Sequence, residues 1–237
     1  MNNLDFDLPS HVHIKVFDHA EQASDALSNE LNTIIQNAVK IQGKATIALS
    51  GGSTPVPMFK ALNQMPLPWN KMVIALVDDR WLPPTHPDSN EALVTQHLLG
   101  YHLENTNFIG FWEPDGDIQS AESKCNTSLA SKLPDLLDAV VLGMGNDGHT
   151  ASLFPQAPQL EYALNTASAC CAISPITAPH ERMTMSANRL LASSNRFLHL
   201  KGKDKLETLK NAVLGNDVKV MPIRLFLKHP LTIYWSP

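Results

Sequence analysis

One segment, residues 137–155, constrains the fold of this chain more than any other, and it reads L-D-A-V-V-L-G-M-G-N-D-G-H-T-A-S-L-F-P. Its early part, residues 139–142, is a continuous apolar run, which is typical of a strand covered on both faces. The turn that follows is rich in glycine, which lets a backbone approach a ligand closely, and it carries Asp147 and His149. Open α/β sheets bind ligands at the carboxyl ends of their parallel strands. The segment therefore predicts such a sheet, with a binding crevice at this turn.

Strand-like and helix-like segments alternate along the rest of the chain, with no repeat or linker between them. The expected strands are residues 13–17, 45–49, 72–77, 107–110, 139–142, 183–186 and 197–200, with a final strand region at 223–227 and 231–235. The expected helices are residues 20–41, a helix through Met58, Phe59 and Leu62, and residues 91–99, 118–133 and 203–214. This alternation predicts right-handed crossovers and a mostly parallel sheet. We expect one α/β domain over residues 1–237.

The composition excludes several classes of protein. Hydrophobic residues make up 43% of the chain and charged residues 17%, which is ordinary for a globular fold. The net charge of −5 leaves no basic face for nucleic acid, so an anionic ligand would need a local cluster of cations. Residues 1–10 lack the pattern of a secretory signal, no apolar run is long enough for a membrane helix, and the three cysteines form no metal-type spacing. We expect a soluble, cytoplasmic protein with no nucleic-acid or membrane partner.

Four polar turns follow predicted strands, so all four should open on one edge of the sheet. The first contains Gly51, Gly52, Ser53 and Thr54, and leads into a helix near Pro55. The free N–H groups and the dipole at a helix start favour a phosphate there. A second interpretation fits the local sequence equally well: Ser53 or Thr54 simply caps the helix. The missing Gly-Lys-Ser/Thr sequence excludes a Walker-type loop.

The second turn is Asp78-Asp79-Arg80, and Asn90 belongs to the same loop. An arginine at this point can bind a phosphate in a fork or stabilise a developing oxyanion. A solvated ion pair at a strand end is the simpler interpretation of these three residues alone. Trp81 and the prolines after it indicate a stiff loop, which fits a positioned arginine better.

The third turn presents His149 next to Asp147, and the fourth presents Lys205 in K-G-K-D-K at a helix start. A histidine in such a setting is the usual general base near neutral pH. Lysines at a helix start oppose the helix dipole, a cost that a bound anion would reverse, although a solvated basic turn is the simpler alternative. Arg182, just before a predicted strand, is a further candidate cation for the same edge.

These motifs resemble those of the 6-phosphogluconolactonases. S-G-G-S-T-P, the D-x-R loop with D-S-N, L-G-M-G-x-D-G-H-T-A-S-L-F-P, R-x-T and G-x-x-K occur in this order over residues 45–209. The resemblance implies the glucosamine-6-phosphate isomerase/6-phosphogluconolactonase fold, a Rossmann-like, doubly wound α/β sheet with a small appended region. It also implies hydrolysis of 6-phospho-D-glucono-1,5-lactone in the oxidative branch of the pentose phosphate pathway, with no metal or organic cofactor. The partner is then a small phosphorylated sugar lactone, and the protein is a monomer or homodimer.

The resemblance also implies roles for individual residues, and with the turns described above it completes the candidate site. His149 would activate water, with Asp147 orienting it, and Arg80 would stabilise the oxyanion or hold the substrate. The phosphate would be bound by Gly51, Gly52, Ser53, Thr54, Arg182 and Lys205. Asp78 and Asn90 would contact sugar hydroxyls or order the loop. The family loop is often D-E-R, so Asp79 is a departure whose role the sequence leaves open.

Three rival functions need separate consideration. Glucosamine-6-phosphate deaminases share the D-G-H turn, but they follow it with N-E-P, and here Phe154 occupies the position of that glutamate and cannot carry a proton. Residues 143–148 formally satisfy the G-x-G-x-x-G pattern of nicotinamide-dependent dehydrogenases, but the nearest acid, Glu161, comes too early to bind the ribose. A non-catalytic sugar-phosphate sensor would need no base, so His149 and Arg80 argue against it without excluding it.

Overall fold

The computed structural model describes residues 6–114 and 116–237 of the 237-residue chain. The expectation of no secretory signal concerns residues 1–10, of which the first five lie outside the described part. None of the described helices is both long and apolar enough to cross a membrane.

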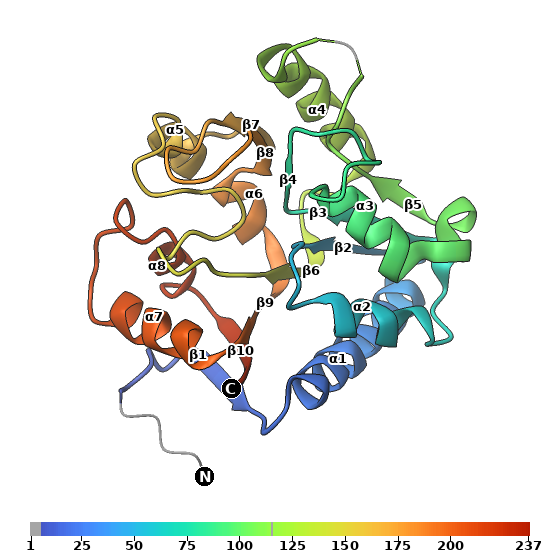
Figure 1. The fold of residues 1–237 in the computed structure, drawn as a ribbon. Helices are drawn as coiled ribbons and strands as arrows, with labels where there is room; N and C mark the ends of the chain where they lie inside the picture. The colour runs from blue at the N-terminus through green and yellow to red at the C-terminus, as the bar shows by residue number, and fades with distance from the viewer. Residues whose placement is uncertain (1–5, 115) are drawn as a thin grey trace.

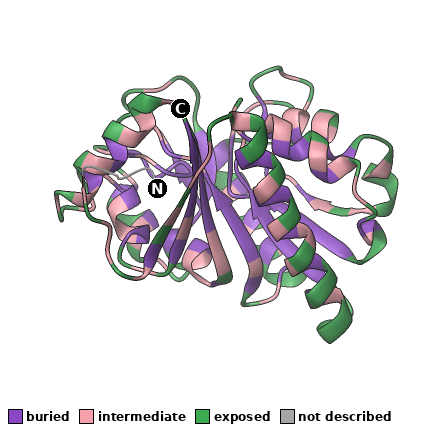
Figure 2. Cartoon of the chain, turned by 90° about the horizontal axis from the view of Figure 1, so that it is seen from below, coloured by how far each residue is buried: buried purple, intermediate pink, exposed green. Residues whose placement is uncertain are grey.

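A seven-stranded parallel sheet forms the centre of the molecule, with its strands in the order β1-β10-β9-β6-β2-β3-β5 (Figure 1). These strands are Val12–Val16 (β1), Ala45–Leu49 (β2), Met72–Leu76 (β3), Asn107–Ile109 (β5), Leu137–Leu142 (β6), Ser193–Lys201 (β9) and Leu231–Ser236 (β10). Strands β2 and β3 are buried at every position, because helices lie on both faces of the sheet (Figure 2). The predicted parallel α/β sheet is confirmed.

The helices differ from the expectation mainly in the last third of the chain. They are Ala20–Gln42 (α1), Val56–Asn63 (α2), Asn90–Val94 (α3), Ile118–Lys132 (α4), Leu160–Asn165 (α5), Ala187–Leu191 (α6), Lys203–Val213 (α7) and Ile223–Phe226 (α8). A π-helical turn, Thr95–Leu99, follows α3, and two short 3₁₀ helices span Trp69–Lys71 and Gly100–Asn105. The predicted strand at residues 223–227 is wrong. Pro222 begins a helical turn there that buries Ile223 and Phe226 on one face, a spacing that a short apolar run does not distinguish from a strand.

A second, three-stranded antiparallel sheet stands beside the carboxyl edge of the main sheet and corresponds to the expected small appended region. It consists of Asp78–Arg80 (β4), Arg182–Met185 (β8) and Cys170–Ile173 (β7), in the order β4-β8-β7. The sequence predicted a loop at Asp78–Arg80 and no strand at Cys170–Ile173. The pairing of β4 with β8 joins residues about a hundred positions apart, which local pattern cannot reveal.

Candidate active site

The order in which the strands are added to the parallel sheet reverses between two neighbouring central strands, β2 and β6. Strands β2 and β6 pair side by side, with Leu49 opposite Val141. After β2 the chain continues to β3 on one side, and after β6 it continues to β9 on the other. The loops that leave these strands therefore diverge and open a crevice at their carboxyl ends, where open α/β sheets bind ligands.

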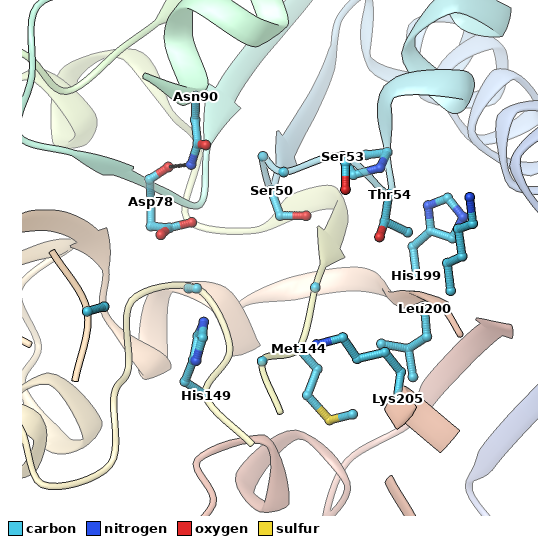
Figure 3. A pocket seen from close by; sticks show the side chains of 18 of the residues that line it. Ser50, Ser53, Thr54, Asp78, Asn90, Met144, His149, His199, Leu200 and Lys205 are labelled. Atoms are coloured by element: carbon cyan, nitrogen blue, oxygen red, sulfur yellow. Dashed lines mark hydrogen bonds between the residues drawn. The ribbon is translucent and has the colours of Figure 1, made fainter. Parts of the chain in front are cut away.

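A pocket of about 360 Å³ occupies this crevice, and residues of all four predicted turns line it (Figure 3). The predicted site residues that line it are Gly51, Gly52, Ser53, Thr54, Asp78, Arg80, Asn90, His149, Arg182 and Lys205. Asp147 does not line the pocket and instead contacts His149. The structure thus brings together side chains from segments far apart in the sequence.

The first turn offers free hydrogen-bonding groups to the pocket. Helix α2 begins at Val56 with Pro55 as its N-cap, and no side chain caps it. The alternative in which Ser53 or Thr54 caps this helix is therefore wrong, and neither hydroxyl has a side-chain hydrogen bond within the described part of the chain. A Cβ at Gly51 would lie 1.9 Å from the Asn90 side-chain oxygen, so only glycine allows the turn to pack against that amide.

The carboxylate of Asp79 fixes the backbone of the second loop, which contains Arg80 and Asn90. This carboxylate is buried and accepts hydrogen bonds from the backbone N–H groups of Arg80, Asn90 and Glu91 and from the Ser89 hydroxyl, at 2.6–3.0 Å. Burial raises the pKa of Asp79, and these hydrogen bonds oppose that rise. The role that the sequence left open is therefore structural: the shorter acid fixes the start of α3 and the backbone of Arg80.

A hydrogen bond between their side chains orients both Arg80 and Asn90. The guanidinium of Arg80 donates to the Asn90 side-chain oxygen at 2.6 Å, and the Asn90 amide donates to the backbone oxygen of Asp78 at 2.8 Å. The oxygen and the N–H₂ group of the Asn90 amide therefore both form hydrogen bonds within the loop. Of the two roles considered for Asn90, ordering the loop is the one that these contacts support.

Two arginines face each other across the small sheet. Arg80 on β4 lies directly opposite Arg182 on β8 in the antiparallel register. Burial lowers the pKa of Arg182, and the nearby positive charge of Arg80 lowers it further. Like charges directly opposite in a sheet are destabilising, and a bound anion would relieve the repulsion. The small sheet thus supplies a side-chain cation pair to the pocket.

Asp78 connects the small sheet to the turn after β6. Its buried carboxylate accepts a hydrogen bond from the Ser152 hydroxyl at 2.5 Å, and the Ser152 backbone N–H donates to the hydroxyl of Thr184 on β8. Ser152 therefore ties the D-G-H-T-A-S segment to both β4 and β8. This serine is part of the D-G-H-T-A-S motif, but the motif alone predicted no role for it.

His149 lines the pocket (Figure 3), and its ring contacts Asp147, which lies outside the pocket lining. The distance from His149 Nδ1 to Asp147 Oδ1 is 2.6 Å. Burial opposes the charge of Asp147, but the hydrogen bond and charge of His149 outweigh this, so the pKa of Asp147 lies below its ordinary value. An ionised carboxylate only accepts, so Nδ1 donates to it and Nε2 remains for the pocket. A Cβ at Gly145 would lie 2.1 Å from the imidazole, so glycine makes room for this ring.

Phe154 closes the pocket beside the histidine. Its ring centroid lies 4.2 Å from that of His149, and the guanidinium carbon of Arg182 lies 5.7 Å from the Phe154 centroid. The phenyl ring therefore separates the imidazole from the arginine and provides no proton-transfer group.

The fourth turn brings Lys205 to the pocket, where its ammonium donates to the side-chain oxygen of Asn146 in the turn after β6. Lys201 and His199, at the end of β9, also line the pocket. His199 was not predicted, although a lone histidine in the apolar strand F-L-H-L, directly before a basic turn, was a signal that could have found it. Among the described residues, no cluster of three or more histidine, cysteine or acidic side chains is placed to hold a metal ion.

Fold and site together define a doubly wound α/β protein whose pocket, at the switch point of its sheet, combines a glycine-rich turn before a helix, paired arginines and a histidine bonded to an acid. Residues 18–235 match the family described as glucosamine-6-phosphate isomerases/6-phosphogluconolactonase, and the chain belongs to this family. The family prediction made from the sequence motifs is confirmed.

Two similar proteins carry the name 6-phosphogluconolactonase. The one from Pseudomonas putida is 38% identical over 232 residues, which is 97% of this chain and 95% of that protein. The crystal structure of the one from Shewanella baltica is 38% identical, with a TM-score of 0.93 over 98% of this chain and 100% of the other. The structure of a monomeric glucosamine-6-phosphate deaminase has a TM-score of 0.77 at 16% identity over 94% of this chain and 97% of the other, so that enzyme shares the fold.

Proposed function

We propose that this protein hydrolyses 6-phospho-D-glucono-1,5-lactone to 6-phospho-D-gluconate, the second step in the oxidative branch of the pentose phosphate pathway. The observation that carries the proposal is the pairing of His149 with Asp147 in a pocket that also holds an anion-binding turn and two arginines. The 38% identity to proteins named 6-phosphogluconolactonase, over nearly the whole chain, supports the same reaction.

His149 is proposed as the general base. Nε2 takes a proton from water while the water oxygen attacks the lactone carbonyl carbon, which gives a tetrahedral oxyanion. The bond from this carbon to the ring oxygen then breaks, and the proton held by His149 returns to that oxygen. Asp147 orients the imidazole and stabilises its charged form, and such base assistance supplies about 10²–10⁴-fold in rate. No covalent nucleophile is needed.

The cations and the glycine turn are proposed to bind the two ends of the substrate. Gly51, Gly52, Ser53, Thr54 and Lys205 bind the phosphate, with Arg182 as a further cation. Arg80 stabilises the oxyanion or holds the substrate, and one well-placed donor at an oxyanion contributes about 2.7–4 kcal/mol. Binding the phosphate far from the carbonyl places the ring, so remote binding energy serves orientation.

Asp78 and Asn90 complete the proposed site. Asp78 reaches the pocket with one oxygen already bonded to Ser152, which leaves the other carboxylate oxygen for a sugar hydroxyl. Asn90 acts through Arg80, whose guanidinium it orients.

The deaminase alternative fails on a specific contact. Phe154 packs against His149 in the place where the deaminases carry a glutamate, so the proton transfers of an isomerisation have no carrier there. A non-catalytic sugar-phosphate sensor explains the anion-binding turn but gives no reason for an acid-supported histidine inside the pocket.

The proposal is tested with freshly generated 6-phosphogluconolactone in an assay coupled to oxidation of the product, against spontaneous ring opening. We expect acceleration well above that background, and a much smaller acceleration with unphosphorylated gluconolactone. Release of ammonia from glucosamine 6-phosphate would favour the deaminase, and phosphate-ligand binding without turnover of either compound would favour the sensor. A cytoplasmic location, and a monomeric or homodimeric state, stay predictions.

A further inference from the structure

His199 lies near the carboxyl end of β9, where its side chain lines the pocket. Strand β9 pairs with β6 as far as Leu198, which lies opposite Leu142. His199 comes one residue later, beside the start of the turn after β6, and on its other side it pairs with Tyr234 of β10. Figure 3 places its ring next to Thr54, across the pocket from His149.

The imidazole of His199 is buried without a hydrogen-bond partner. Its exposed fraction is 4%; Nδ1 is closed to solvent and has no partner among the described residues, which leaves Nε2 as the ring nitrogen that a ligand in the pocket can reach. A buried polar atom of this kind costs about 1–3 kcal/mol, and native proteins rarely keep one without a reason. In most histidines a hydrogen bond at one ring nitrogen determines which nitrogen carries the proton, and at His199 no group of residues 6–114 and 116–237 does so.

The two histidines of the pocket have different surroundings. His149 is bonded to the carboxylate of Asp147. His199 has no acid beside it, and burial lowers its pKa to about 4. Its ring is therefore neutral at pH 7 and always carries one N–H and one bare nitrogen.

We propose that His199 is a substrate-binding residue that donates its ring N–H, as a neutral imidazole, to a phosphate oxygen of the ligand. The role rests on the proposed function for the identity of the substrate, but not for the binding of a phosphate group. The position fits, because the Ser53 and Thr54 turn and Lys205 line the same part of the pocket. A neutral donor adds a directional hydrogen bond without placing a further positive charge beside Lys201 and Lys205.

The test compares His199→Leu, which keeps the volume but removes the donor, with His199→Gln, which keeps an N–H. We expect His199→Leu to weaken the binding of inorganic phosphate and 6-phosphogluconate about tenfold or more, and His199→Gln to recover most of this loss. With the phosphorylated lactone, KM rises by a similar factor and kcat stays within about twofold. With unphosphorylated gluconolactone, the two variants and the parent protein have equal kcat/KM.

A matched control is His102→Leu, because His102 also has a buried ring nitrogen without a partner but stacks on Trp69 away from the pocket. It leaves phosphate binding unchanged. In ¹⁵N-histidine NMR spectra of the parent protein, we expect His199 in the neutral pattern at pH 7, with an N–H resonance that shifts when inorganic phosphate is added.

Unchanged phosphate affinity in His199→Leu, or an imidazolium pattern for His199, overturns the assignment, as does a loss of kcat at constant KM. If His199→Leu unfolds, His199→Gln and the NMR titration of the parent protein decide the question. If the protein binds phosphate through His199 but opens no lactone, the proposed function fails and the assignment of His199 stands.

Discussion

The two walls of the pocket are constructed in different ways. The main-sheet wall, residues 50–55, 143–149 and 199–205, is built from turns at the ends of parallel strands and presents backbone groups, hydroxyls, two histidines and the ammonium groups of Lys201 and Lys205. The small-sheet wall, β4 and β8, presents the charged side chains of Asp78, Arg80 and Arg182, which depend on networks of hydrogen bonds beneath them. Changes in the first wall should therefore alter chemistry or binding directly, whereas changes in the second should also alter stability.

The largest effect is expected in the main-sheet wall. His149→Ala removes the proposed base and should lower kcat for the phosphorylated lactone by about 10²–10⁴-fold, close to spontaneous opening. The affinity for 6-phosphogluconate should be retained, since the phosphate turn is untouched. Steady-state kinetics and calorimetric titration check both parts, with His13→Ala, an exposed histidine on β1, as the control. A variant as fast as the parent protein removes His149 from the mechanism.

The next effect concerns the small-sheet wall, where one substitution is expected to lower activity and raise stability. Arg182→Met should lower kcat/KM by about 10–100-fold, because a charged hydrogen bond to the ligand is lost. The free energy of unfolding without ligand should rise by about 0.2–1 kcal/mol, because the repulsion by Arg80 across the register is removed. Urea unfolding and kinetics measure the two quantities.

Arg189 provides the matched comparison for Arg182. Burial also lowers the pKa of Arg189, but its guanidinium donates to two backbone oxygens, those of Pro134 and Asp135. Within the described residues the Arg182 guanidinium donates only to the backbone oxygen of Pro179, and its buried Nε has no partner. Arg189→Met should therefore lower stability and leave kcat/KM unchanged. The same stability change in both arginine variants would contradict the interpretation of Arg182 as a cation held against repulsion.

A third change tests whether the hydrogen bonds accepted by Asp79 stabilise the small-sheet wall. Asp79→Asn places an amide N–H₂ against backbone N–H donors and should lower the free energy of unfolding by about 1–3 kcal/mol. The activity should fall about tenfold or less, because Arg80 and Asn90 lose their fixed backbone. Asp88→Asn, in the exposed part of the same loop, should change neither quantity. Equal effects of the two variants would show that Asp79 does not organise the loop.

The last effect concerns the pH dependence of stability and Glu91, whose backbone N–H donates to Asp79. Burial raises the pKa of Glu91 to about 7, and the nearby charge of Asp79 contributes to the rise. Between its ordinary pKa of 4.5 and about 7, the folded state binds more protons at Glu91 than the unfolded state. Stability from this group is therefore present at acid pH and lost as the pH rises through 7.

Glu91→Gln should remove this loss and raise the free energy of unfolding at pH 8 by about 1–3 kcal/mol, with little change at pH 4.5. Urea unfolding at both pH values measures the difference. An unchanged dependence of stability on pH in the variant would show that Glu91 ionises normally in the folded protein.

The contrast between the walls also explains what could be predicted from the sequence. In the main-sheet wall, buried apolar runs followed by glycine turns are local patterns, so the turns at Gly51, His149 and Lys205 were recognisable. His199 was not predicted: the lone histidine before the basic turn was a usable signal, but only the structure places its ring in the pocket. In the small-sheet wall, Arg80 and Arg182 were each predicted as candidate cations. The sequence did not predict that they lie opposite each other in the sheet, or that Asp79 fixes the loop that carries Arg80.

By itself, the sequence determined the parallel α/β sheet, the family and the segments that carry the chemistry. These follow from the period of apolar residues and from glycine-rich turns, which act over a few residues. Only the tertiary structure decided that β4 pairs with β8, that residues 223–226 form a helix, and that a neutral histidine lies across the pocket from the acid-supported one. The physical reason is that burial and long-range strand pairing, not local propensity, set the charge states and partners of these side chains.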